Sequence, residues 1–224
     1  MATELTHQPV VVHEQEATMG IVAGGSIAEV IGGIGAVVLA ILGLTGLLPR
    51  EMAAIATMAV GVGLLLESTA VATRLSELLS ETERNLSNMA KLAGGIGAEF
   101  LGGVAGGVLG LLAILGIAPL ILMPIAVIVF GASLLLSSGA TYRLDSLASH
   151  LGQKALTGAQ MLAGVAASGV QVLVGIAGIA LGIVALIGIS SMVLILVGLL
   201  SIGAAVLISG GAVSGTIASV MQRE

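Results

Sequence analysis

The stretch AGGIGAEFLGGVAGGVLGLLAILGIAP, from Ala93 to Pro119, repeats an earlier part of the chain without a gap. The earlier copy, AGGSIAEVIGGIGAVVLAILGLTGLLP, runs from Ala23 to Pro49, and each of its positions lies 70 residues before its counterpart. A third, more diverged copy follows at an offset of 72, which aligns Gln171 with Glu99. An internal repeat of this kind predicts like units that pack against one another.

Each copy continues into a second apolar stretch, so the repeated unit is a pair of helices. About 20 apolar residues are long enough to cross a bilayer. The chain has six such stretches, at residues 27–48, 51–72, 98–117, 120–141, 169–188 and 191–213. The sequence therefore predicts an all-α integral membrane protein with six transmembrane helices, built as three repeated helical hairpins in a pseudo-threefold arrangement.

The hairpins and their connections suggest a division of the chain. We expect a polar N-terminal tail over residues 1–18, a first hairpin with its linker over 19–92, a second with its linker over 93–157, and a third over 158–224. Both long linkers carry leucines at helical spacing between charged residues, which predicts amphipathic helices or extensions of the transmembrane helices. A partner-docking face on these linkers is the alternative.

Composition agrees with a membrane protein. Hydrophobic residues make up 57% of the chain and charged residues 8%, against about 25% charged in soluble domains. The absence of cysteine excludes disulfides and thiolate metal sites, and the net charge of -5 argues against nucleic acid as a partner. Lys and Arg gather on the side of the linkers and termini, so both termini are predicted to be cytoplasmic.

The first helix of each copy carries a stripe of small residues on one face, at steps of four and three. Small residues let helices approach closely in a bilayer, where apolar burial gives no driving force. The stripe is thus a predicted helix-packing surface of the small-xxx-small type. Its members are Gly33, Ala36, Ala40 and Gly43 in copy one, Gly103, Gly106, Gly110 and Ala113 in copy two, and Gly175, Gly178, Gly182 and Ala185 in copy three.

A long polar side chain heads each stripe: Glu29, Glu99 and Gln171. A carboxyl group inside the hydrocarbon is a candidate functional group, because desolvation disfavours its charged form. The alternative is a place near the cytoplasmic interface, where water or linker backbone satisfies it. Glu67 could lie at the depth of Glu29 and form a coupled pair with it; the matching residues in the other copies are Ser137 and Ser209.

Other chemistry is sparse. GGIGA at 32–36 and GGIGAE at 94–99 follow no strand and no GK[ST] comes after them, so they do not predict a nucleotide loop. His7 and His13 lie in the polar tail, where a solvated role is favoured over a metal site. No nucleophile, histidine and acid are arranged for catalysis. We therefore expect no enzymatic activity, no cofactor and no metal.

The hairpin tips GIAPLILMP (116–124) and GISSMVL (188–194) carry no charge, and the chain has no Trp. Such tips lie in the outer interface or are covered by neighbouring subunits, and we favour the second. The leading hypothesis from these residues is a non-enzymatic homo-oligomer with a structural role in the lipid bilayer. The alternatives are a proton or small-solute channel lined by Glu29, Glu99 and Gln171, and an accessory subunit of a larger membrane complex.

The repeated hairpin resembles the HdeD-like acid-resistance membrane proteins. The matching pieces are GAVVLAILGLTGLLP (35–49) with AVGVGLLLESTA (59–70), GGVLGLLAILGIAP (106–119) with IVFGASLLLSSGA (128–140), and GIALGIVALIGISS (178–191) with LLSIGAAVLISGGA (199–212). The resemblance implies a six-span bacterial inner-membrane protein linked to acid or stress survival, with no catalytic residues to transfer. It therefore widens the leading hypothesis to a structural or stress-protective role. The chain departs from that family in its few aromatic residues, in its Glu29, Glu99 and Gln171 positions and in its acidic N-terminal tail.

Overall fold

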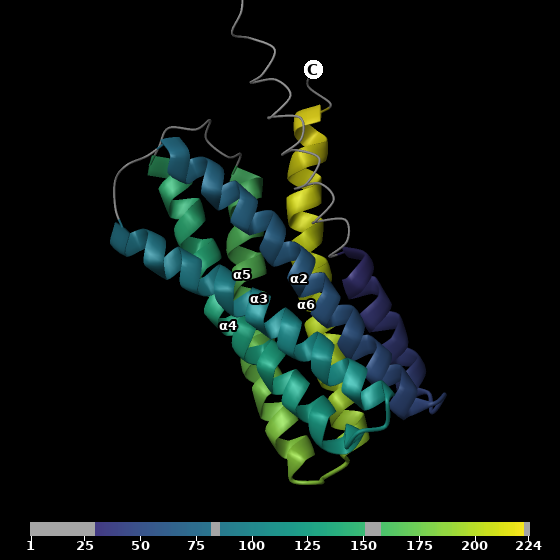
Figure 1. Ribbon diagram of the computed structural model, residues 1–224. Helices are drawn as coiled ribbons and strands as arrows, with labels where there is room; N and C mark the ends of the chain where they lie inside the picture. Colours follow the sequence, from purple (N-terminus) through teal and green to yellow (C-terminus); the bar gives the residue numbers. More distant parts are fainter. Residues whose placement is uncertain (1–29, 82–85, 151–157, 222–224) are drawn as a thin grey trace, which may run out of the picture.

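The computed structural model describes residues 30–81, 86–150 and 158–221, and side chains within 30–69, 97–138 and 169–209. These residues are helical except at three short turns, at 45–48, 115–118 and 187–190 (Figure 1). A shorter apolar helix, Val30–Leu44, precedes α2 (Pro49–Glu81), α3 (Leu86–Ile114), α4 (Pro119–His150), α5 (Gly158–Leu186) and α6 (Ser191–Met221). Each of α2 to α6 is long and apolar enough to cross a membrane. The predicted fold class, an all-α membrane protein, is confirmed.

The long helices continue beyond the predicted apolar stretches toward the linkers. In α2 the helix runs on to Glu81, past residue 72, where the predicted stretch ends. With 33 residues and a rise of about 1.5 Å per residue, α2 is roughly 50 Å long, whereas the hydrocarbon core is about 30 Å thick. The linker residues in α2 to α5 are therefore extensions of the transmembrane helices, one of the two structures expected for them.

The three hairpin tips share one turn. Gly46, Gly116 and Gly188 adopt a positive φ, which glycine accepts without steric cost. In the first tip the Gly46 amide donates to the Gly43 carbonyl at 3.1 Å, and the Leu47 amide donates to the Leu42 carbonyl at 3.3 Å. This is the Schellman pattern that ends a helix. The tip backbone thus satisfies its own polar groups, which lets its side chains be apolar.

The second helices of the hairpins form the centre of the bundle. α2, α4 and α6 contact one another, α3 packs between α2 and α4, and α5 packs between α4 and α6. The Val30–Leu44 helix contacts α2 through Gly32 and α6 through Gly33. The outcome is an inner ring of three helices with an outer helix in each of its three grooves, and the hairpin tips lie at the end away from the end of α6 (Figure 1).

Glycine pairs make the same contact at three places. A Cβ added to Gly103 of α3 would lie 2.9 Å from the Gly61 carbonyl oxygen of α2. In the same way, a Cβ added to Gly175 would lie 2.7 Å from the Gly131 carbonyl oxygen, and a Cβ added to Gly33 would lie 3.0 Å from the Gly203 carbonyl oxygen. Each stripe therefore packs against the second helix of another hairpin in the same chain. All twelve stripe residues are buried.

Buried side chains, all of them apolar except Thr57, fill the axis of the inner ring. Counted by the repeat offsets, one residue from each of α2, α4 and α6 makes a layer, and every member is at most 1% exposed. From the tips toward the linkers, the layers are Ala53, Met123 and Ile195; Thr57, Val127 and Leu199; Val60, Phe130 and Ile202; and Leu64, Leu134 and Val206. The described axis is a packed core.

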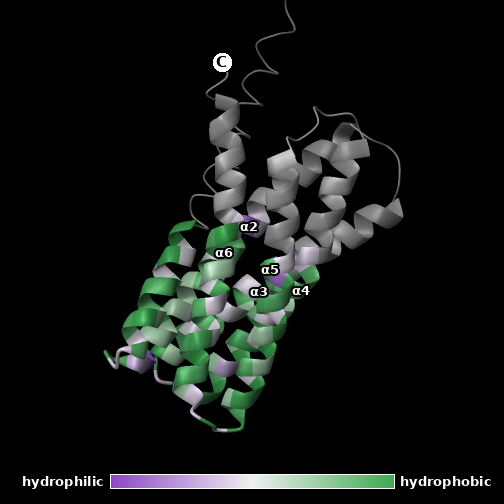
Figure 2. Ribbon diagram, turned by 180° about the vertical axis from the view of Figure 1, so that it is seen from behind, coloured by the Kyte–Doolittle hydropathy of each residue, from purple (hydrophilic) through white to green (hydrophobic). Residues whose placement is uncertain are grey.

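The outer surface is apolar as well. Ile31, Leu101 and Leu173, which are equivalent in the repeat, are 64%, 67% and 69% exposed. Figure 2 shows that the described helices are hydrophobic over most of their length. Such a surface suits lipid, because lipid tails are as apolar as leucine.

Candidate functional site

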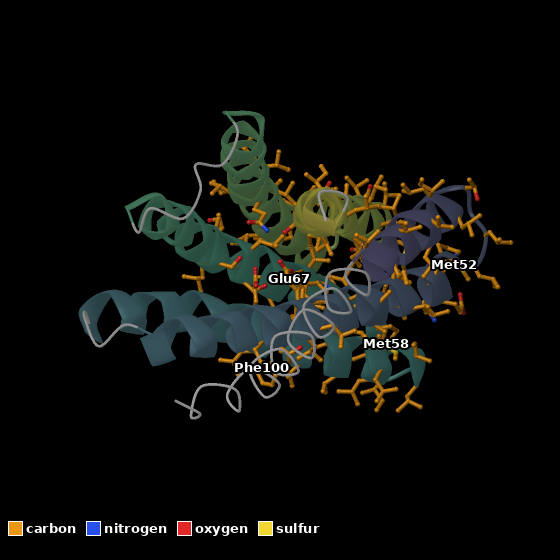
Figure 3. All side chains as sticks on the ribbon, turned by 90° about the horizontal axis from the view of Figure 1, so that it is seen from above. Met52, Met58, Glu67 and Phe100 are labelled. Carbon is orange, nitrogen blue, oxygen red and sulfur yellow. The ribbon has the colours of Figure 1, made fainter. Side chains whose placement is uncertain are left out.

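A polar layer continues the axial stack at its linker end. One helical step beyond Leu64, Leu134 and Val206, the next inward positions are Glu67, Ser137 and Ser209. Figure 3 places Glu67 in the middle of the bundle, among helices of all three hairpins, and Phe100 toward its edge. With Glu99 and Gln171 from the outer helices, these residues form what we call the polar layer.

In the third hairpin the polar layer is a short chain of hydrogen bonds. The Gln171 Nε2 group donates to the Ser209 hydroxyl at 3.3 Å, and that hydroxyl donates to Glu67 Oε1 at 3.3 Å. Gln171 is 4% exposed. Because Ser209 belongs to α6 and Glu67 to α2, the chain links the third hairpin to the first.

In the second hairpin Glu99 takes the place of Gln171. Glu99 is 5% exposed, and its hydrogen-bond partner is the Ser137 side chain of α4. The Ser137 hydroxyl also lies 3.2 Å from the Leu134 carbonyl oxygen of its own helix. The heads of the second and third stripes thus each contact a serine on the second helix of their own hairpin.

The polar layer lies near one boundary of the hydrocarbon. Glu67 follows Pro49 by 18 residues, or about 27 Å of helix at 1.5 Å per residue. Glu99 precedes Ile114, the end of α3, by 15 residues, or about 22 Å. When the tip ends of these helices are placed at one boundary of a hydrocarbon core about 30 Å thick, the polar layer lies just inside the opposite boundary. Its hydrogen-bond partners are side chains of the bundle.

The predicted site residues divide into those the structure places and one it does not. Glu99 and Gln171 occupy equivalent positions, and Glu67 contacts Ser209. Glu29, and with it the expected Glu29–Glu67 pair, lies outside the described residues. The bridge between Ser209 and Glu67 was missed, although the repeat alignment puts them in register, because alignment does not say that these positions meet on an axis.

Few ionisable groups accompany the polar layer. Within the described side chains, the ionisable residues are Arg50, Glu51, Glu67 and Glu99. Arg50 and Glu51 lie at a hairpin tip, so Glu99 has no basic partner among these side chains. The same residues contain no group of three side chains that could hold a metal ion.

Other buried hydroxyl groups bond within their own helices. Thr57 donates to the Ala53 carbonyl at 2.7 Å, and Ser133 donates to the Phe130 carbonyl at 2.9 Å. These groups need no partner from another helix. The polar layer differs because its side chains bond between helices.

Comparisons with protein-family models, with curated proteins and with solved structures find no match to this chain. Its apolar helices agree with a multi-pass protein of a lipid bilayer.

Proposed function

We propose that this chain is a non-enzymatic membrane protein with a structural, stress-protective role in a bacterial inner membrane. The observation that carries the proposal is the axial core, in which four successive layers of side chains are almost completely buried. A bundle that is closed along its axis and packed through glycine contacts is suited to resist deformation. The resemblance to the HdeD-like family supports the link with acid or stress survival.

Survival of bacteria that produce the chain tests this role. Cells with the wild-type chain should survive an acid challenge better than cells with an empty vector. The variant Gly61→Ala should lose the benefit, because its new Cβ would meet the Gly107 amide nitrogen at 2.6 Å. Gly107→Ala is the matched control, since its new Cβ meets nothing within 4 Å. Equal survival of vector and wild-type cells at verified membrane levels would contradict the proposal.

Homo-oligomerisation stays a prediction, and its expected surface has changed. The glycine stripes that suggested it are occupied within the chain, which leaves the exposed aliphatic faces for contacts between copies. Light scattering of the purified chain in mild detergent should give a mass above that of one chain. A single-chain mass at every concentration would remove homo-oligomerisation from the proposal.

The channel alternative draws support from the polar layer, where Glu99 and Gln171 are buried and Glu67 is half-buried. The apolar layers below it oppose this alternative, because a conducting path along the axis would have to displace Phe130 and its neighbours. Vesicles that contain the chain should therefore show the same proton leak as empty vesicles. A leak that Glu99→Gln and Glu67→Gln together abolish would favour the channel.

The accessory-subunit alternative predicts a different result from the same material. Purification from the native membrane would then yield a second protein in fixed proportion. The structural role proposed above requires none, so a stoichiometric partner would replace it.

The predicted orientation also belongs to the proposal. Both termini and both linkers are cytoplasmic in it, since the linker-side residues Arg74, Lys91 and Arg143 outnumber Arg50 at the tips. Cysteines introduced at residue 2 and at Thr45 should differ in labelling by an impermeant reagent added to intact cells. Labelling of residue 2 from outside would reverse the orientation.

A further inference from the structure

The three hairpin tips differ in charge at one pair of equivalent positions. In the first hairpin, the first turn of α2 contains Arg50 and Glu51, and both side chains are exposed. The residues that the repeat offsets align with this pair are Leu120 and Ile121 in the second hairpin, and Met192 and Val193 in the third. Among the described side chains, only the first tip therefore carries charge.

The described part of the chain offers Arg50 and Glu51 no good ion pair. Adjacent residues on a helix point about 100° apart and do not face each other. The other described acids, Glu67 and Glu99, belong to the polar layer. Glu67 follows Arg50 by 17 residues, which is about 25 Å of helix. An ion pair for either tip residue must therefore come from outside the described residues.

The charged tip continues into an open aliphatic face of α2. Glu51, Ile55, Val62 and Leu66 follow one another at steps of four, seven and four, so they lie on one side of the helix. Ile55, Val62 and Leu66 are 40%, 47% and 40% exposed. The residues equivalent to Ile55 and Val62 are half-buried in both other hairpins: Ile125 and Ala132 in α4, and Val197 and Ala204 in α6. Helix α2 therefore presents its outer face more openly than α4 or α6.

A twofold dimer would give both tip charges a partner. Two copies with the same orientation in a membrane are related by an axis along the membrane normal. Such a dimer uses one surface twice, so a residue beside the axis meets its own counterpart, and two neighbouring residues exchange partners. Because Arg50 and Glu51 have opposite charges, the exchange makes two ion pairs. The uncharged tips of the second and third hairpins have no such complementarity.

We propose that two copies of this chain associate in the membrane through the outer face of α2, with Arg50 of each copy paired with Glu51 of the other. Ile55, Val62 and Leu66 pack against their counterparts along the axis. The Val30–Leu44 helix and α3, which contact α2 on either side, flank the interface. This assignment rests on the homo-oligomerisation proposed above and names its surface.

Charge reversal tests the ion pairs. Arg50→Glu and Glu51→Arg should each weaken dimerisation by about tenfold, because two exposed attractive pairs become repulsive. The double variant, which carries both changes, restores opposite charges and should dimerise like the wild type. Energy transfer between copies labelled at a cysteine introduced at residue 2 measures the dissociation constant in vesicles. Unchanged dimerisation of the single variants, or no recovery in the double variant, would overturn the pairing.

Cross-linking tests the surface. The chain has no cysteine, so Leu66→Cys places a single thiol on the proposed face. Leu136→Cys and Ile208→Cys are matched controls, because they stand at the equivalent positions of α4 and α6 and are 64% and 48% exposed. A short bifunctional maleimide should link two copies of Leu66→Cys in the membrane and leave both controls as single chains. Equal cross-linking of all three variants, or none of Leu66→Cys, would exclude the α2 surface.

These experiments separate the α2 interface from the functions proposed above. A single-chain mass of the wild type at every concentration removes homo-oligomerisation and the interface together. A larger mass, with the charge variants unaffected and Leu66→Cys not cross-linked, removes the interface alone. Acid survival tests the structural role independently of both results.

Discussion

The outer and inner helices of this bundle pack with opposite kinds of side chain. The outer helices present glycine and alanine, and at Gly103 and Gly175 they touch the backbone of the neighbouring helix. The inner helices present Leu64, Phe130 and Ile202 to one another and exclude all but a trace of solvent. In a bilayer, apolar burial gives no net gain, so association depends on contact alone. The difference indicates that close approach holds the outer helices, whereas volume filling keeps the axis closed.

The largest effect is expected at a glycine contact of the outer helices. In Gly131→Ala, the new Cβ would lie 2.6 Å from the Gly175 carbonyl oxygen. Backbone cannot rotate away, so we expect a loss at the upper end of the roughly 1–3 kcal/mol that overpacking costs. Steric trapping in bicelles measures the free energy of unfolding. Gly107→Ala is the control, and an equal loss in both variants would show that glycine itself, and not the contact, matters.

A smaller effect is expected on the axis. Phe130→Ala leaves a cavity in the third axial layer, and in a soluble core such a change costs about 3–5 kcal/mol. Part of that cost is the transfer of apolar atoms from water, which is missing when the unfolded helices stay in lipid. We expect a loss of about 2 kcal/mol by the same measurement. A loss above that of Gly131→Ala would reverse the comparison between axis and glycine contact.

The polar layer should contribute less than either packing surface. Ser209→Ala removes the middle of the chain from Gln171 to Glu67. Hydrogen bonds between transmembrane helices average about 0.6 kcal/mol, so losing two of them predicts a decrease of about 1 kcal/mol in stability. Ser201→Ala, which removes a bond within one helix, serves as control. If the free energy of unfolding fell no more than in the control, the hydrogen bonds between the hairpins would not stabilise the bundle.

The smallest effect is expected on the lipid face. Leu101→Ala changes a side chain that is 67% exposed, and exposed substitutions usually alter stability by less than about 0.5 kcal/mol. A loss of more than about 1 kcal/mol would place Leu101 in a contact between copies of the chain. The same variant therefore bears on homo-oligomerisation.

Much of the bundle was predictable from periodicity. The apolar stretches predicted the helices α2 to α6, and the repeat indicated that Glu99 and Gln171 are equivalent. The neighbours of each stripe were not predictable, because Gly103 could face its own hairpin, another hairpin or another molecule with the same sequence. The contacts of Gly103 with Gly61 and of Gly33 with Gly203 settled this through the closure of the ring.

The candidate site shows the same division. The sequence identified acids in an apolar setting and a serine in register with Glu67, but it did not indicate that Glu67 and Ser209 are in contact. The predicted pair of Glu67 with Glu29 lies outside the described residues. In the structure Glu67 is reached by Ser209, 142 residues away. A contact of that separation depends on how α2 and α6 meet, which no local pattern encodes.

The sequence by itself determined that the chain is helical, apolar enough for a bilayer and threefold repeated, because hydrophobic length and period are properties of the chain. The tertiary structure decided which surfaces meet: the stripes close a ring within one molecule, the large residues fill its axis, and the polar layer joins the first and third hairpins. These are relations between helices distant in the chain. They follow from the ring closure, in which every outer helix must find a groove between two inner ones.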